Sequence, residues 1–580
     1  MCGLGIVAFC SLHPGALGAP VWKPPVIPFR SSVRLEAGLE QTVDRAITRL
    51  SAPPYTESFI LADVNFGQQR IFTEYSGDIS GRMLSMIARE RRFGLPDSWP
   101  LDHLLAGLAA AQQPDGHFGK PQDLAHEIVG DRDMPILWGN GRLLMGLVDV
   151  YAVSRDPRAL DMARKLGDYY VATDAYLDRP ELVHKFGNYA AGFATCYFSG
   201  IEGMVGLWRA TRDGRYLAQA RRMAHLMMQY TKPGEQHSHG RLCALRGLLD
   251  LYKATSDPAY LSYVTDEYRF TATHYLWPTG GLSEMTVPTF QRDEGCTEAD
   301  WLRLSLELWR LTGKPQYLDD AEWTLRNEMA VNQFPNGGFG HHTARFAAGL
   351  MDGYEPNNDR TAQEAYWCCS EHCPRALLDA VSYAIVPRGT DVFLNLYEPM
   401  KTEFVVKGQP VSFEIAPAQG GEIVRIVIST HRPIRMALHL RRPAWCSSMT
   451  VDGRPEPENP EGRVVLSRQW RGTTSVEIRF GAVLRAWREG QPAFGVPVDQ
   501  WDSHSDSLVA LFLGPYLLGR DWDDLSDPPV VAVGGTLSNI GENMVLHGSD
   551  GKTWVFRSVA AITPKGSGFR IRVRLAATSH

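Results

Sequence analysis

The sequence predicts a mainly helical fold, an (α/α)6 toroid, followed by a C-terminal antiparallel β-sandwich region. Three observations support this prediction. A ten-residue pattern recurs four times, at an interval typical of stacked helical hairpins. Long loops rich in Gly, His, Trp and Tyr separate the hairpins. Past about residue 402, the helical spacing of apolar residues gives way to alternation and to runs of β-branched residues.

The recurring segment begins with Tyr or Trp, passes through a polar turn that holds Pro or Gly, and ends at Leu. Its four copies have the same length and occupy residues 151–160, 208–217, 252–261 and 309–318. The aromatic residue closes one apolar helical pattern, and Leu and Ala at helical spacing belong to the next. Each copy is therefore expected to join two helices through a tight turn.

Such hairpins cannot bury their apolar faces alone, so they must pack side by side into an open solenoid or a closed ring. Amphipathic patterns over residues 98–112 and 375–385 add an earlier and a later helix. About six hairpins over roughly 350 residues suit a closed toroid. At one mouth of that toroid we expect the longer loops to form a cleft with aromatic faces that suits sugars; these loops are 113–142, 184–200, 232–243, 276–298 and 332–369.

The chain is expected to divide into three parts. Residues 21–402 would form the toroid, and residues 403–580 one or two β-sandwiches that carry no candidate chemistry. Residues 1–20 are apolar and rich in small residues, but they contain Pro14 and lack a basic start. They are either a truncated export signal or a disordered terminus, so secreted, periplasmic and cytoplasmic locations all stay open.

Composition and charge exclude several classes of function. The 580 residues are 44% hydrophobic and carry a formal net charge of -6 without basic runs. That pattern fits neither nucleic acid nor an anionic membrane surface, and no apolar stretch is long enough to span a bilayer. A neutral substrate fits it best, and the aromatic cleft expected above suits an oligo- or polysaccharide. The nine cysteines are too sparse for a disulfide framework.

Two short motifs carry the candidate chemistry: Glu294-Gly295-Cys296 and Cys368-Cys369. Adjacent cysteines do not readily bridge to each other, because the ring they would close is strained. In an extended segment Glu294 and Cys296 project to the same side. One carboxylate and three thiolates would complete a tetrahedral zinc site. The alternative is that the cysteines pack as small apolar residues.

A zinc-bound thiol loses its proton at neutral pH and can then act as a nucleophile. A retaining glycosidase needs a nucleophile on one side of the anomeric carbon and a general acid on the other. Candidates for the acid are Glu284, Glu298 and Glu322, although a glutamate on a helix is by default a solvated surface residue. Histidines of the mouth loops are candidates for binding sugar hydroxyls or, alternatively, ordinary surface or capping residues; they are His184, His239, His341 and His342.

Several motifs, in order along residues 100–520, resemble those of glycoside hydrolase family 127, whose type members are β-L-arabinofuranosidases. They are LLAGLAAAQQPDGHFG at 104–119, the Glu-x-Cys motif at 294, the glutamate at 322, the Cys-Cys motif followed by Arg375, LRRPAWCSSMTVDGRP at 440–455 and GRVVLSRQW at 462–470. The resemblance implies an (α/α) toroid with β-sandwiches, and zinc bound by Glu294, Cys296, Cys368 and Cys369. It also implies Cys368 as the nucleophile and Glu284 as the acid/base.

Departures from the family pattern bear on the substrate, a plant- or microbial-type glycan. Arg142 stands where a sugar-binding histidine is usual, and a second pocket histidine is replaced near Ser199, whereas His239 is retained. His372 stands where asparagine is usual. Because a guanidinium group suits a carboxylate, we expect a β-L-arabinofuranoside-like sugar or a related sugar with an acidic group.

Two rival functions remain open at the level of sequence. A polysaccharide lyase is one, because toroid-plus-sandwich folds also host β-elimination and Arg142 could face an acidic sugar. The other is a non-catalytic carbohydrate-binding protein in which zinc is structural. The identity of the sugar, exo or endo action and the oligomeric state are not determined by these patterns.

Overall fold

The computed structural model describes most of the chain. The described residues are 22, 23, 25, 34–35, 39–120, 134–185, 192–234, 237–287, 290–356, 367–418, 422–457, 459–501, 507–523, 528–532, 537–540, 543–547, 553–562 and 568–576. The N-terminal segment 1–20, interpreted above as an export signal or a terminus, lies outside them. Among the described helices, none has the length and apolarity that crossing a membrane requires.

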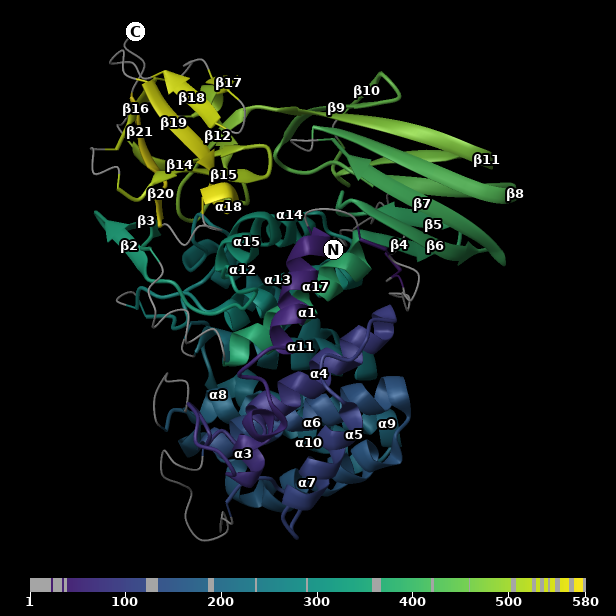
Figure 1. Ribbon diagram of the computed structural model, residues 1–580, viewed down its shortest axis with the longest axis vertical. Helices are drawn as coiled ribbons and strands as arrows, with labels where there is room; N and C mark the ends of the chain where they lie inside the picture. Colours follow the sequence, from purple (N-terminus) through teal and green to yellow (C-terminus); the bar gives the residue numbers. More distant parts are fainter. Residues whose placement is uncertain are drawn as a thin grey trace, which may run out of the picture.

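Six helices pack in sequence around a closed ring, each against the next and the last against the first. They are α4 (Asp78–Phe93), α6 (Met134–Ser154), α9 (Ile201–Thr211), α11 (Ser238–Thr255), α13 (Gly295–Thr312) and α17 (Cys368–Ala384). A second layer packs outside them, comprising α1 (Leu39–Leu50), α5 (Leu101–Ala111), α7 (Pro157–Leu177), α10 (Gly214–Tyr230), α12 (Pro258–His274) and α14 (Gln316–Trp323). The predicted toroid is confirmed, and it fills the lower part of Figure 1.

The four repeated segments are turns between an inner and an outer helix. In three of them an aspartate caps the outer helix, its side chain accepting a hydrogen bond from the backbone N–H two residues later: Asp156, Asp213 and Asp257. The residue after each inner helix adopts a positive φ, which ends the helix. Gly313 takes this position in the fourth turn, with a φ of 73°.

Short helices fill the connections of the toroid. They are α2 (Glu57–Ile60), α3 (Ala62–Asn65), α8 (Phe193–Phe198) and α15 (Met329–Asn332), with a π-helical turn at Thr324–Glu328; α18 (Val559–Ile562) belongs to the C-terminal region.

The strands form two sheets above the toroid in Figure 1. The first holds β1 (Arg34–Leu35), β4 (Ile385–Arg388), β5 (Asp391–Leu394), β6 (Met400–Val406), β7 (Gln409–Pro417), β8 (Ile423–Arg441), β9 (Cys446–Val451), β10 (Arg454–Glu456) and β11 (Arg463–Ala482). Its centre is the long antiparallel pair β8–β11, whose register shifts at a bulge between Trp470 and Gly472.

The second sheet contains twelve strands and includes one hairpin from the helical half of the chain. Its strands are β2 (Ala344–Ala347), β3 (Leu350–Tyr354), β12 (Leu484–Trp487), β13 (Val496–Pro497), β14 (Ser507–Leu513), β15 (Tyr516–Asp521), β16 (Val530–Ala532), β17 (Leu537–Ile540), β18 (Asn543–His547), β19 (Thr553–Ser558), β20 (Phe569–Arg570) and β21 (Arg572–Ala576). The hairpin β2–β3 falls where a mouth loop was expected, and β3 pairs with β20. It ties that loop to the C-terminal sheet.

Candidate active site

A cavity of about 400 Å³ lies where the N-terminal ends of several inner helices meet. Its lining residues are Phe72, Tyr75, Asp78, Arg82, Trp138, His237, His239, Glu284, Met285, Val287, Phe290, Arg292, Glu294, His341, Trp367 and Cys368. Four of the five predicted mouth loops contribute residues, and the described part of 184–200 contributes none. Helix N-termini carry partial positive charge, so this end of the toroid favours carboxylates and thiolates.

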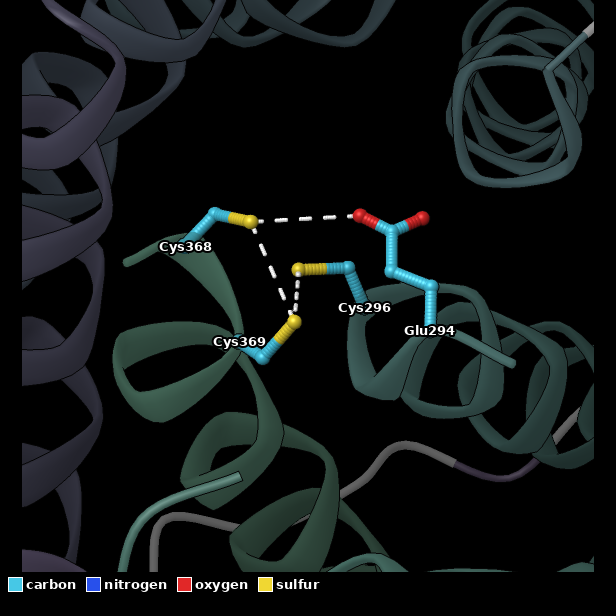
Figure 2. A group of neighbouring side chains, drawn as sticks. All are labelled: Glu294, Cys296, Cys368 and Cys369. Carbon is cyan, nitrogen blue, oxygen red and sulfur yellow. Dashed lines mark hydrogen bonds between the residues drawn. The ribbon is translucent and has the colours of Figure 1, made fainter. Parts of the chain in front are cut away.

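The structure brings Glu294, Cys296, Cys368 and Cys369 together (Figure 2). Glu294 stands at the N-cap position of α13 and Cys296 lies in its first turn, whereas the two adjacent cysteines begin α17. One ligand atom from each residue lies within 4.8 Å of all the others. Two helix starts, distant in sequence, thus supply the whole group.

The spacing of this group fits a four-coordinate zinc ion. The Sγ–Sγ distances are 3.5 Å for Cys296–Cys369 and 3.8 Å for Cys368–Cys369, and Cys368 Sγ lies 3.8 Å from Glu294 Oε1. A disulfide needs about 2.05 Å. A tetrahedron with zinc–sulfur distances of about 2.3 Å has sulfur–sulfur edges of about 3.8 Å. The donor set and its spacing therefore suit zinc.

The thiols of this group differ in their electrostatics. Hydrogen bonds from Cys296 and Cys369, with nearby Arg82 and His341, hold the pKa of Cys368 well below its usual range. Burial raises the pKa of both Cys296 and Cys369. Cys368 is also the one member of the group that is partly exposed. The thiolate is therefore favoured at the cysteine that faces the cavity.

Arg82 places a buried positive charge beside the thiols. Its guanidinium donates hydrogen bonds to Asp78 at 2.8 Å, to Cys296 Sγ at 3.3 Å and to His239 Nε2 at 3.0 Å. Because Nε2 of His239 must accept, its Nδ1–H donates to Asp300, 2.9 Å away. The imidazole is neutral, and burial lowers the pKa of His239 to about 3. Asp78 and Arg82 precede every recognised motif, so no sequence signal singled them out.

Asp300 fixes the residues behind the cavity floor. It accepts hydrogen bonds from His239, His372 and Cys243, and it pairs with Arg246 and Arg303. His239, Asp300 and His372 are close enough together to resemble a second metal group. Because the guanidinium groups of Arg246 and Arg303 already balance the charge of Asp300, we interpret this cluster as structural and not as a second metal site.

Among the three candidate glutamates, Glu284 is the one that lines the cavity. It accepts a hydrogen bond from Arg292 Nε at 2.6 Å, and the Nε2 atoms of His237 and His341 lie 3.8 and 3.9 Å away. Burial opposes its ionisation, but His237, His341 and Arg292 outweigh burial and lower the pKa of Glu284. Its carboxyl group is accessible from the same space as Cys368.

Glu298 and Glu322 are buried elsewhere. Glu298 accepts a hydrogen bond from the backbone N–H of Leu282, and burial raises its pKa strongly. Glu322 is only 3% exposed and accepts from Arg441 and Trp445 of the first-sheet region, each at 3.0 Å. It is therefore neither a cavity residue nor the solvated surface residue that its helical pattern suggested.

Three predicted sugar-binding residues do not reach the cavity. Arg142 is fully buried behind Trp138, with its guanidinium carbon 5.1 Å from the ring centroid. His184 is exposed on a turn outside the cavity lining. His342 is buried against Phe334 and hydrogen-bonds Asp293. Packing of these side chains, which the sequence pattern does not reveal, turns them away.

His237 was not singled out in the sequence, although it lies in a predicted mouth loop. Its Nδ1 accepts from the Gly240 backbone N–H, so Nε2–H points to Glu294, 3.3 Å away, and to Glu284. Burial opposes its charge, but the two carboxylates raise the pKa of His237. It bridges the metal group and the candidate acid/base.

Comparison with known proteins places this geometry in context. Residues 98–379 match the model of the β-L-arabinofuranosidase GH127 catalytic domain, and residues 391–482 match that of the GH127 middle domain. No curated protein sequence matches the chain at a significant level.

Solved structures are similar over nearly the whole chain. A GH127 β-arabinofuranosidase matches with a TM-score of 0.70 at 17% identity, covering 96% of this chain and 98% of its own. A GH127 β-L-arabinofuranosidase from Geobacillus stearothermophilus T6 matches with a TM-score of 0.70 at 14% identity, covering 94% of this chain and 99% of its own. At such identities the likeness concerns the fold.

Proposed function

Because this chain belongs to glycoside hydrolase family 127, we propose that it hydrolyses a β-L-arabinofuranoside or a closely related glycoside with Cys368 as the nucleophile and Glu284 as the acid/base. The chain is a glycoside hydrolase, which disfavours the lyase and the non-catalytic binding protein. The observation that carries the finer proposal is the group of one carboxylate and three thiols at the wall of a cavity that Glu284 also lines.

Zinc would be held by Glu294, Cys296, Cys368 and Cys369, and it would keep these thiols deprotonated at neutral pH. The protein itself supports a thiolate at Cys368, because its neighbours donate hydrogen bonds to it and Arg82 lies close by. Arg82 and His239 would hold the thiols in place and would not contact the sugar.

In the first step, Cys368 Sγ attacks the anomeric carbon and forms a carbon–sulfur bond while the bond to the leaving oxygen breaks. Glu284 gives a proton to that oxygen, which requires the bound substrate to raise the pKa that Arg292, His237 and His341 lower in the free protein. In the second step, Glu284 accepts a proton from water, whose oxygen replaces sulfur at the anomeric carbon. Arg292 orients Glu284 through a hydrogen bond of 2.6 Å, and His237 lies between this carboxyl group and that of Glu294.

An arabinofuranoside is favoured over an acidic sugar. The acidic-sugar hypothesis depended on Arg142, which is buried behind Trp138. The cationic side chains that do line the cavity are already paired, Arg82 with Asp78 and Arg292 with Glu284. A sugar carboxylate would have to compete with these pairs.

The test measures metal content and activity of the wild type, Cys368→Ser and Cys373→Ser. Cys373 lies on the same helix, but it donates to the Gly295 carbonyl and is outside the group of four, so it is a matched control. The substrates are 4-nitrophenyl glycosides of neutral and uronic sugars, including the β-L-arabinofuranoside.

We expect about one zinc per chain in the wild type and a loss of activity of roughly 1,000-fold or more in Cys368→Ser. Cys373→Ser should retain most of its activity. Unchanged turnover in Cys368→Ser would refute the nucleophile, and an ultraviolet-absorbing unsaturated product would indicate a lyase. A clear preference for uronic glycosides would refute the neutral sugar.

A further inference from the structure

The cavity changes character from its buried end to its mouth. Polar residues form the buried end: His237 and Glu294 are each 4% exposed. Apolar residues form the mouth, where Phe72 is 39% and Val287 37% exposed. Trp367 and Phe290 are partly exposed beside them. The reactive groups thus lie at the polar end. The leaving group of the glycoside would therefore lie toward the apolar end.

The exposed apolar residues gather at this mouth. Eight large hydrophobic residues are notably exposed among the described residues: Ile71, Phe72, Tyr176, Val287, Val405, Val465, Val483 and Val555. Phe72 and Val287 line the cavity, and Ile71 adjoins Phe72 in sequence. The remaining five lie on α7, on strands of the two sheets and, for Val483, between β11 and β12. Clustered apolar exposure marks a binding surface, whereas single exposed residues need no explanation.

Phe72 is held at the mouth by an unfavourable backbone conformation. Its φ is 58°, in the left-handed region that is unfavourable for a bulky residue. Its ring packs edge-on against Tyr75 at 5.1 Å and Trp367 at 4.9 Å, measured between ring centroids. Because the Phe72 side chain stays 39% exposed, its burial offsets little of this unfavourable backbone conformation. Such strain is typical of residues kept for binding or catalysis.

We propose that this mouth is a subsite for an apolar aglycone, so that the preferred substrate is a glycoside of an alkyl or aryl alcohol and not of a second sugar. The proposal rests on the hydrolase function proposed above. A second sugar would require hydrogen-bonding partners, and Arg292, whose guanidinium lies over the Phe290 ring, is already paired with Glu284. The rings of Phe72, Phe290 and Trp367 would pack on an aryl group, and Met285 and Val287 would contact an alkyl chain.

The test uses methyl, butyl and hexyl β-L-arabinofuranosides. Because the leaving alcohols have similar acidity, differences in kcat/KM report contact with the chain rather than leaving-group chemistry. A fully buried CH₂ contributes about 0.8 kcal/mol, or roughly fourfold. With partial burial we expect kcat/KM to rise at least about tenfold from methyl to butyl in the wild type.

Two variants each remove an apolar side chain from the cavity mouth, and a third is the matched control. Phe72→Gly deletes the ring and relieves the left-handed backbone, so it should fold. Val287→Ser removes an apolar rim residue, and Val405→Ser makes the same change on an exposed position of β6. We expect the ratio of butyl to methyl kcat/KM to fall toward one in the first two and to stay at the wild-type value in the third.

The affinity for 4-butylphenol alone, measured by calorimetry, tests this inference independently of the hydrolase proposal. We expect Phe72→Gly to weaken that binding at least about fivefold and Val405→Ser to leave it unchanged. If no glycoside is cleaved but this pattern of binding holds, the hydrolase proposal fails and the apolar subsite stands. Equal kcat/KM for methyl and butyl glycosides, or equal binding by wild type and Phe72→Gly, would overturn the subsite.

Discussion

Glu284 owes its candidate role to where its side chain points. It shares the cavity with Cys368, whereas Glu298 and Glu322 are buried in separate hydrogen-bonded pockets. The local sequences of the three glutamates do not reveal this difference, because it depends on which loop folds over which helix.

Replacing Glu284 by Gln removes the proposed acid/base and retains the shape of the side chain. We expect kcat/KM for an alkyl β-L-arabinofuranoside to fall by about 100- to 10,000-fold, because an alkyl alcohol leaves poorly without a proton. A 2,4-dinitrophenyl glycoside, whose leaving group needs little protonation, should lose much less in the glycosylation step. Pre-steady-state kinetics of both substrates measure the difference.

Glu298→Gln is the control for Glu284→Gln. Burial holds the pKa of Glu298 well above its usual range, so an amide is a close substitute for its neutral form. Glu298→Gln should therefore retain most of the activity on both the alkyl and the 2,4-dinitrophenyl glycoside. Equal losses on both substrates in Glu284→Gln would contradict the acid/base assignment.

The buried carboxyl group of Asp320 should make the free energy of unfolding depend on pH. Burial raises the pKa of its carboxyl to about 7, although Tyr268 donates a hydrogen bond to it at 2.8 Å. Because the folded protein holds this proton to a higher pH than the unfolded chain, its contribution to stability is complete below about pH 4 and is lost as the pH rises through about 7.

In Asp320→Asn that contribution no longer titrates. From pH 5 to pH 8 we expect the wild type to lose up to a few kcal/mol more unfolding free energy than the variant, measured by denaturant titration at each pH. Asp161→Asn, at a side chain that is 64% exposed, should keep the wild-type pH dependence. The same slope in Asp320→Asn and the wild type would refute the raised pKa.

The inner helices share one direction, so their positive N-terminal ends lie at one end of the toroid and their negative C-terminal ends at the other. Their N-termini surround the candidate active site. Toward their other ends, arginines and a lysine line a separate cavity that includes Arg89, Arg209, Lys253 and Arg310. Cations there oppose the partial negative charge of helix C-termini. We therefore interpret that cavity as part of the stabilising ion-pair network.

The caps in the repeated turns should contribute measurably to stability. Asp257 accepts a hydrogen bond from the Ala259 backbone N–H at 3.0 Å. Asp257→Ala should lower the free energy of unfolding by about 1 kcal/mol because it leaves that N–H without its side-chain acceptor. Asp266→Ala, on the same helix at a 62% exposed side chain, should change it by less than about 0.5 kcal/mol. Equal effects on the denaturant midpoint would argue against the cap.

Arg441 joins the toroid to the first sheet. Its side chain is fully buried and donates to Asp319 at 2.6 Å and to Glu322 at 3.0 Å, both on α14. Trp445, four residues later, donates to the same glutamate. This contact gives Arg441 and Trp445 of the sandwich motif a structural role, in a region where no catalytic role was expected.

Arg441→Gln leaves two carboxylates without their buried cation. We expect the free energy of unfolding to fall by about 3 kcal/mol, measured by denaturant titration. Arg435→Gln, an exposed position on the same strand, should have little effect. If the two variants were equally stable, the ion pair would not be what holds the sheet on the toroid.

The sequence alone determined the helical hairpins, because an apolar stripe with a period near 3.6 residues and a polar turn of constant length have few structural solutions. It also identified the Glu-x-Cys and Cys-Cys motifs, because adjacent thiols in a cysteine-poor chain have few structural roles. The strands after residue 402 were visible as alternation, but the earlier strands β2 to β5 were not, since they are short.

Only the tertiary structure decided which side chains share the cavity. Arg142 looked like a sugar ligand and is buried behind Trp138, whereas Arg82, with no motif around it, contacts Cys296. Glu322 looked like a surface residue and anchors the first sheet. The direction of a side chain depends on how distant helices and loops pack against it, and that packing is not encoded in the local spacing of residues.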